Sequence, residues 1–155
     1  MAKVSCGLLM VDARLRVLLV HPGGPFFKRR DAGVWSIPKG MCEPGEEPIA
    51  AARREFREEL GFEPPATELF ELGQVKQSGG KVVRAWAFRG EWDPALLESL
   101  TFELEWPPNS GKRETFPEVD RAEFFDAAVA EQKIIAAQRP LLERALAWAR
   151  SKQQG

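Results

Sequence analysis

Three glutamates, Glu55, Glu58 and Glu59, lie in a segment with the apolar spacing of an α-helix. At about 100° per residue they share one arc of that helix, beside its apolar stripe. Like charges at these spacings repel, and each pair destabilises an isolated helix by about 0.3 kcal/mol. A divalent cation reverses the sign, because carboxylate oxygens on adjacent turns are hard ligands that suit Mg²⁺ and Mn²⁺. The spacing therefore predicts a metal site on this helix.

A second interpretation of the same segment is a surface helix held by ion pairs. Arg53, Arg54 and Arg57 alternate with the glutamates, and Arg54 can reach Glu58 one turn further on. Arg57 points away from the acidic arc, so it cannot neutralise that face. This alternative has to be weighed against the residues on either side of the helix.

Those flanking residues follow a longer pattern, G-x5-E-x7-R-E-U-x-E-E-x-G-U, in which U is an apolar residue. It begins at Gly40, passes Glu46 and continues through Arg54-Glu55-Phe56-Arg57-Glu58-Glu59-Leu60-Gly61-Phe62, with all nine fixed positions filled. The pattern resembles the Nudix box of the Nudix hydrolases, a loop–helix–loop with which that family binds divalent metal. The resemblance extends loosely over most of the chain and is specific for residues 40–62.

The resemblance implies both a fold and a reaction. The fold is α+β, an α/β/α sandwich around a mixed β-sheet, as a single domain over residues 1–155. The reaction is hydrolysis of a nucleoside diphosphate linked to another moiety, in the class of nucleoside triphosphates or dinucleoside polyphosphates. Mg²⁺ or Mn²⁺ is the implied cofactor, since bound cations neutralise and orient a pyrophosphate and lower the pKa of an attacking water.

Site residues carry over from the box position by position. Arg54 and Glu46 are implied to hold the helix and to orient Glu55. The implied metal ligands are the three box acids and one backbone oxygen: Glu55, Glu58, Glu59 and the Gly40 carbonyl.

The general base, which takes a proton from water, stays open. Glu55 leads from its place in the box, although the metal can occupy both of its oxygens. Glu103 and Glu105 alternate with apolar residues, so they share one face of a predicted strand. Glu118 is a further candidate. We expect Glu55 to act as a metal ligand and Glu103 or Glu105 to act as the base.

Two residues are predicted to contact the substrate. Lys39, in Pro-Lys-Gly, can place a point charge against a phosphate. That tripeptide is similar to its counterpart in diadenosine polyphosphate and diphosphoinositol hydrolases. Trp106, which two prolines follow, offers a surface on which a base can stack.

Three alternative functions remain. One is a diphosphoinositol polyphosphate hydrolase, and another is a catalytically silent Nudix-like module that binds nucleotide. The third is a structural domain with a salt-bridged helix. Under this interpretation the match of Gly40, Glu46 and Gly61 to the box is a coincidence.

These residues need a framework of strands and helices. A helix is predicted over residues 48–60, with Pro48 in its first turn and Gly61 just past its end. Its predicted buried stripe is Ile49, Ala52, Phe56 and Leu60. Strands are predicted over residues 4–11, 17–20, 34–37, 68–77, 81–89, 102–106 and 121–125, a loop over 40–45, and a C-terminal helix over about 140–150. This order lacks regular βαβ units and favours a mixed sheet.

Composition excludes several classes of protein. The 155 residues carry 22 Lys and Arg against 23 Asp and Glu, so the net charge of −1 attracts neither nucleic acid nor membrane. No apolar stretch approaches the ~20 residues of a membrane helix. Cys6 and Cys42 are too few for a disulfide framework. We expect a cytoplasmic domain whose partner is a small nucleotide or polyphosphate; the sequence specifies no oligomeric state.

Overall fold

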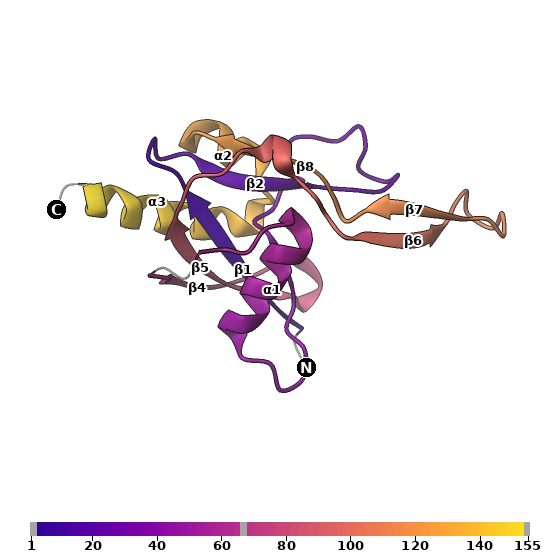
Figure 1. Ribbon diagram of the computed structural model, residues 1–155, viewed down its shortest axis with the longest axis horizontal. Coiled ribbons are helices and arrows are strands. Elements are labelled where there is room, and N and C mark those ends of the chain that lie inside the picture. The colour runs from indigo at the N-terminus through magenta and orange to yellow at the C-terminus, as the bar shows by residue number, and fades with distance from the viewer. Residues whose placement is uncertain (1–2, 66–67, 154–155) are drawn as a thin grey trace.

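The computed structural model describes residues 3–65 and 68–153, which form a mixed β-sheet with helices on both faces (Figure 1). The strands are β1 (Val4–Val11), β2 (Val17–Pro22), β3 (Lys39–Met41), β4 (Phe70–Lys76), β5 (Val82–Arg89), β6 (Thr101–Glu105), β7 (Arg113–Pro117) and β8 (Val119–Phe125). The helices are α1 (Pro48–Leu60), α2 (Ala127–Lys133) and α3 (Arg139–Gln153). The main sheet has the order β4-β5-β1-β2-β8, with β1 and β5 parallel and its other neighbours antiparallel. The predicted α/β/α sandwich is confirmed.

Alternate residues of the central strands supply two apolar layers, one on each face of the sheet. From β1, Leu8 packs in the layer that contains Phe56 of α1. Its neighbour Leu9 packs in the opposite layer, with Leu142 and Leu146 of α3. α1 is therefore anchored to the sheet by its own apolar face, and its acidic arc is left at the side.

The sheet opens between β1 and β2, and this opening positions the loop before α1. β1 pairs with β2 at Val11 and Val17, whereas its residues 5–7 pair with β3. Residues 34–37 cross this gap and form only isolated bridges, one of them from Ser36 to Val20. The prediction of a strand over 34–37 was therefore wrong. Its apolar residues are buried because the segment crosses the gap in the sheet, and it forms no continuous strand pairing. The segment predicted as a loop over 40–45 instead begins inside β3.

Helix α1 begins and ends where the sequence predicts. Pro48 occupies its first turn, and Gly61 follows in a left-handed conformation (φ 89°), donating its N–H to the Arg57 carbonyl at 2.8 Å. One residue of the predicted stripe differs. Ile49, in the first turn of α1, is 41% exposed. Ala51 is buried in its place, together with the other three residues of the predicted stripe.

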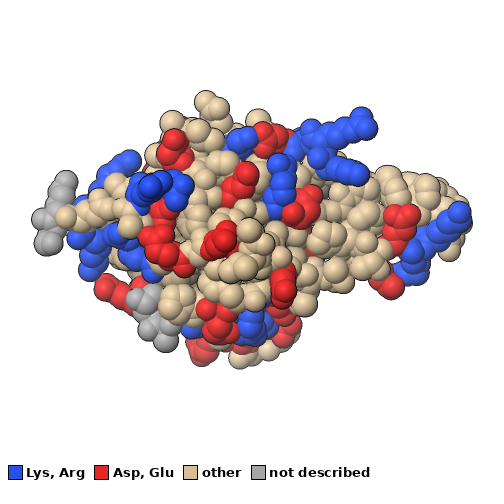
Figure 2. Space-filling view, turned by 45° about the horizontal axis from the view of Figure 1, so that its top comes forward, with Lys and Arg blue, Asp and Glu red and all other residues tan. Residues whose placement is uncertain are grey.

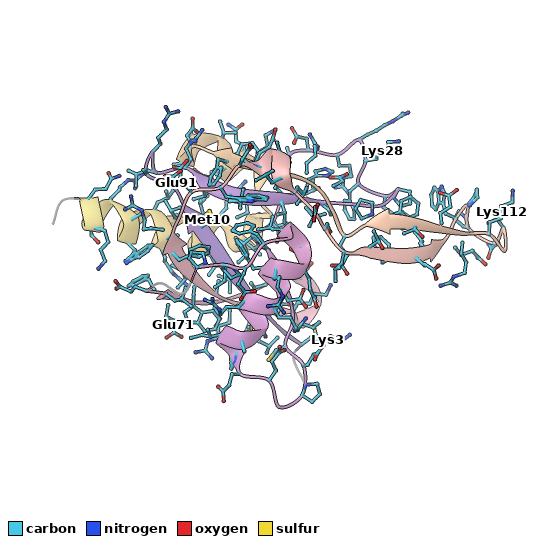
Figure 3. All side chains as sticks on the ribbon, viewed as in Figure 1. Lys3, Met10, Lys28, Glu71, Glu91 and Lys112 are labelled. Atoms are coloured by element: carbon cyan, nitrogen blue, oxygen red, sulfur yellow. The ribbon has the colours of Figure 1, made fainter. Side chains whose placement is uncertain are left out.

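The second half of the chain contains one element that the sequence did not predict. The strands predicted over 68–77 and 81–89 are present as the antiparallel pair β4 and β5, joined through a 3₁₀ turn at Ser78–Gly80. Strand β6 pairs with the unpredicted β7 in a separate two-stranded sheet that projects from the body (Figure 1). Lys112 lies at the tip of this projection (Figure 3).

The surface carries charges of both signs. Acidic and basic side chains are interspersed on the face drawn in Figure 2. None of the helices within residues 3–65 and 68–153 has the length and apolar character needed to cross a membrane.

Candidate active site

Glycine is required at position 40 because the Glu55 carboxylate lies directly against it. A Cβ built at Gly40 would lie 2.0 Å from both Cδ and Oε2 of Glu55, far inside van der Waals contact. The register of β3 against β1 places Gly40 opposite Cys6, with α1 packed over both strands. The Glu55 side chain is only 13% exposed, and burial raises the pKa of its carboxyl.

Arg54 donates hydrogen bonds to three glutamates of the box and to one backbone carbonyl. Its guanidinium donates two hydrogen bonds to Glu46, from Nε at 2.8 Å and from Nη2 at 3.1 Å. Nη1 donates to Glu55 at 2.8 Å and to Glu58 at 3.1 Å. Nη2 also donates to the Met41 carbonyl at 2.9 Å, which joins the helix to the end of β3. Arg54 lowers the pKa of Glu46 to about 2. The expected pairing of Arg54 with Glu46 and Glu55 is therefore present in the structure.

A second group of charges lies next to the group around Arg54. The Glu59 carboxylate accepts a hydrogen bond from the Lys39 backbone N–H at 3.2 Å, and burial raises the pKa of Glu59 to about 8 against the opposing effect of the Lys39 ammonium. Burial in turn lowers the pKa of Lys39. The pKa of Glu118 is raised by burial and then by the charges of Glu55 and Glu58, so Glu118 faces the box acids across the site.

Lys39, Glu59 and Glu118 form the charged end of a cavity of about 350 Å³. Most of its remaining wall is apolar. The segment after β2 contributes Phe27 and Arg30 to that wall. An apolar pocket with a few convergent charged groups is the usual form of a small-molecule site.

The donor set suits a divalent cation in chemistry and in charge. Burial raises the pKa of Glu55, Glu59 and Glu118, so it disfavours the charged form of each, and a nearby cation would offset that cost. Carboxylate and carbonyl oxygens are the ligands that Mg²⁺ and Mn²⁺ prefer. In the part of the chain that the structure describes, no three acidic, histidine or cysteine side chains stand at the spacing of a preformed metal site. Arg54 instead holds Glu55 and Glu58.

The structure does not bring Glu103 and Glu105 to this site. Both lie on the exposed side of β6, because Phe102 and Leu104 take the inward positions of the alternation. Glu103 is 63% exposed and faces Arg113, and the Glu105 carboxylate accepts from the Asn109 N–H. No hydrogen bond or ion pair among the described residues joins either acid to α1.

Trp106 lies in a different cavity, of about 440 Å³, beside Lys28 and Phe116. The edge of its ring meets Phe26, with centroids 5.5 Å apart. Gly24, Pro25 and Pro117 also line this cavity, whereas Pro22 and Glu118 line the one at the box. The two cavities thus share neighbouring parts of the chain.

Sequence reasoning missed the contribution of Phe27 to the site. The only signal available was a pair of phenylalanines beside Lys28-Arg29-Arg30 in a Gly- and Pro-rich loop. Glu118 carried a better signal, since Phe-Pro-Glu-Val-Asp places an acid at a turn into a strand. The sequence alone contains no signal that would place the turn at Glu118 opposite α1.

Comparison with known proteins gives consistent matches. A family model described as "NUDIX domain" matches residues 1–145. An RNA pyrophosphohydrolase of Roseobacter denitrificans is 44% identical over 57 residues, which cover 34% of this chain and 36% of that protein. The matched segments span at most about a third of the curated relatives' own length.

Solved structures match over nearly the whole chain. A C. elegans Ap4A hydrolase in a binary complex gives a TM-score of 0.67 at 18% identity, covering 95% of this chain and 98% of that one. A MutT NUDIX hydrolase from Burkholderia pseudomallei gives 0.64 at 22% identity, covering 93% and 98%. At these identities the matches show a shared fold.

Proposed function

Because the chain belongs to the NUDIX domain family, we propose that it is a divalent-metal-dependent pyrophosphohydrolase that cleaves a nucleoside diphosphate linked to another moiety. The observation that carries this proposal is a set of partly buried carboxylates, of which Glu59 and Glu118 line the cavity and Glu55 lies beside them on α1. Arg54 alone pairs with both Glu55 and Glu58, and a divalent cation would add the positive charge that this set of acids lacks. The names of two relatives, an RNA pyrophosphohydrolase and a mitochondrial ADP-ribose pyrophosphatase, support the same class of reaction.

Each box residue has a role in the proposal. Glu55, Glu58, Glu59 and the Gly40 carbonyl would hold Mg²⁺ or Mn²⁺, which when bound would supply positive charge to the diphosphate and lower the pKa of water. Arg54 positions Glu55 and Glu58 through its hydrogen bonds and fixes the helix to Glu46. The Lys39 ammonium, at the charged end of the cavity, binds a phosphate oxygen.

Glu118 is the base that best fits this arrangement. It lies at the cavity, and its raised pKa brings it closer to the value that general-base catalysis needs at neutral pH. Replacing Glu118 with Gln is expected to lower kcat by about 10²-fold or more while the metal concentration for half-maximal rate stays unchanged. The matched control variants are Glu103→Gln and Glu105→Gln, exposed acids on β6, which should keep the wild-type rate.

Three outcomes bear on that assignment. Glu55→Gln is expected to lose both rate and metal affinity, as a ligand does. If Glu118→Gln keeps its rate and Glu55→Gln loses rate alone, the base is in the box helix. If Glu103→Gln or Glu105→Gln loses rate alone, the hairpin acids act in the reaction in spite of their exposed positions.

The cavity places the organic part of the substrate. We propose that the nucleoside lies against Phe27 and Arg30, since an aromatic ring and a guanidinium both stack on bases. The second cavity is lined by residues close in sequence to those of the first. We propose that Trp106 stacks there on the second aromatic group of a two-ended substrate. The cytoplasmic location expected from the sequence remains part of this proposal.

The test is a hydrolysis screen with a matched catalytic control. Wild type and Glu58→Gln are incubated with Mg²⁺ and, in turn, ADP-ribose, a dinucleoside tetraphosphate, nucleoside triphosphates and an inositol pyrophosphate. Release of nucleotide or phosphate by wild type, absent with EDTA and strongly reduced in Glu58→Gln, is expected for one of the nucleotides. Release from the inositol compound alone would move the substrate to the diphosphoinositol class. Nucleotide binding with no release at all would identify a silent module.

A further inference from the structure

Residues 23–33, which we call the strap, follow β2 and form one wall of the cavity at the box. Phe27 and Arg30 line the cavity from the strap, opposite Lys39, Glu59 and Glu118. The strap contains neither helix nor strand, so its shape depends on individual hydrogen bonds. At its ends, Gly23 donates its N–H to the Glu118 carbonyl at 2.9 Å, and Gly33 donates to the Gln132 carbonyl at 3.0 Å. Lys28 points away from the body near the middle of the strap (Figure 3).

Side chains hold the strap between those ends at two adjacent residues. Trp35 Nε1 donates to Asp31 Oδ1 at 2.8 Å, and the buried His21 holds Arg30. His21 is fully buried at the end of β2, and its Nε2 lies 2.7 Å from the Arg30 carbonyl oxygen. A carbonyl oxygen only accepts, so Nε2 is the donor of this hydrogen bond. The edge of the His21 ring also packs against Trp35, with centroids 5.2 Å apart. The ring is therefore fixed in place by the sheet and by the core.

The other nitrogen of the same ring holds the opposite wall. His21 Nδ1 lies 2.7 Å from Asp120 Oδ1, and Asp120 comes two residues after Glu118. A single imidazole thus bridges the strap and the start of β8, which are 90 residues apart in sequence. His21 does not line the cavity, so it cannot contact a ligand there.

We infer that His21 is a positioning residue that sets the width of the substrate cavity, by tying the Phe27 and Arg30 wall to the start of β8, next to Glu118. This inference rests on the proposed function, in which that cavity receives the nucleoside. Loss of the Nε2 bond frees the strap and reduces binding of the organic part of the substrate. The box, on the other side of the cavity, is unaffected.

The test separates the two ring nitrogens. In His21→Asn the side-chain amide reaches about as far as Nδ1, so it can keep Asp120 but loses the Arg30 carbonyl. In His21→Gln the amide reaches about as far as Nε2 and can keep the strap. We expect His21→Asn to raise KM about tenfold with kcat within about twofold of wild type, and His21→Gln to stay near the wild-type KM.

A matched control addresses stability. Asp12, in the turn between β1 and β2, is also buried and accepts hydrogen bonds from the Arg14 and Arg16 backbone N–H groups. Asp12→Asn should lower the melting temperature as His21→Asn does, yet leave KM unchanged. Equal KM values for His21→Asn and Asp12→Asn would overturn the inference.

Backbone hydrogen exchange gives a readout that does not depend on activity. In His21→Asn, exchange should accelerate at the amides of Arg30 and Gly33 and remain slow in α1. Unchanged exchange in the strap would overturn the inference even if no substrate is found. Accelerated exchange in a protein that hydrolyses nothing would contradict the proposed function while supporting His21 as the anchor of the strap.

Discussion

Replacing Gly40 with Ala should remove activity while leaving stability nearly unchanged. The added Cβ would lie 2.0 Å from the Glu55 carboxyl, whereas ordinary contact begins at about 3.5 Å, so that carboxyl has to retreat by about 1.5 Å. Misplacing a catalytic group by about 1 Å can cost about 10²-fold in rate, and we expect at least that loss in kcat/KM. Gly40 lies in β3 without a left-handed φ, and the clash falls on the end of a side chain and not on backbone. The free energy of unfolding should therefore change by less than about 1 kcal/mol.

Gly45 is the matched control for that variant. It lies in the loop between β3 and α1, its φ is +78°, and an added Cβ meets no atom within 4 Å in the part of the chain described. Gly45→Ala should lose about 1–2 kcal/mol of stability through backbone strain and keep its turnover. The assay pairs urea denaturation with Mg²⁺-dependent hydrolysis of the substrate found in the screen. Wild-type turnover in Gly40→Ala, or an equal loss of turnover in both variants, would refute the argument that Gly40 exists to seat Glu55.

Three further predictions concern charge. Burial raises the pKa of Glu59 to about 8, so metal-free wild type loses stability as pH rises from about 4.5 to 8, and Glu59→Gln should show a higher melting temperature than wild type at pH 8 but not at pH 4. Arg54 lowers the pKa of Glu46 to about 2, so the stability that this pair contributes is present above about pH 4.5 and is lost as pH falls toward 2. The urea midpoint of Glu46→Gln should therefore fall less steeply than that of wild type over this range. Lys39→Ala should weaken binding of long polyphosphates more than of short ones in competition assays, whereas equal losses would indicate a structural role for Lys39.

The box was predictable because its information is local. The spacing of Phe56 and Leu60 defines the period of α1, and Pro48 and Gly61 mark its ends. The pairing of Arg54 with Glu58 follows from a single helical turn. Each of these features needs only neighbouring residues, so the helix and its acids emerge from the sequence with correct bounds.

Features that depend on distant parts of the chain could not be predicted in this way. Strand β7, Arg-Glu-Thr-Phe-Pro, has no alternation of apolar and polar residues and exists because β6 pairs with it. The alternation that suggested a cleft position for Glu103 is equally compatible with an exposed ribbon. The position of Glu118 opposite the box depends on the corner between β7 and β8, and no periodicity encodes that corner.

The most direct test of a metal site on α1 is a calorimetric titration of Mn²⁺ into wild type and Glu58→Gln, each with and without the nucleotide identified in the screen. The acid set of Glu55, Glu58 and Glu59 predicts saturable binding to wild type at millimolar metal or below. Binding to Glu58→Gln should be clearly weaker, with the hydrolysis rate following occupancy. An absence of binding to wild type at millimolar Mn²⁺, with and without nucleotide, would contradict the account.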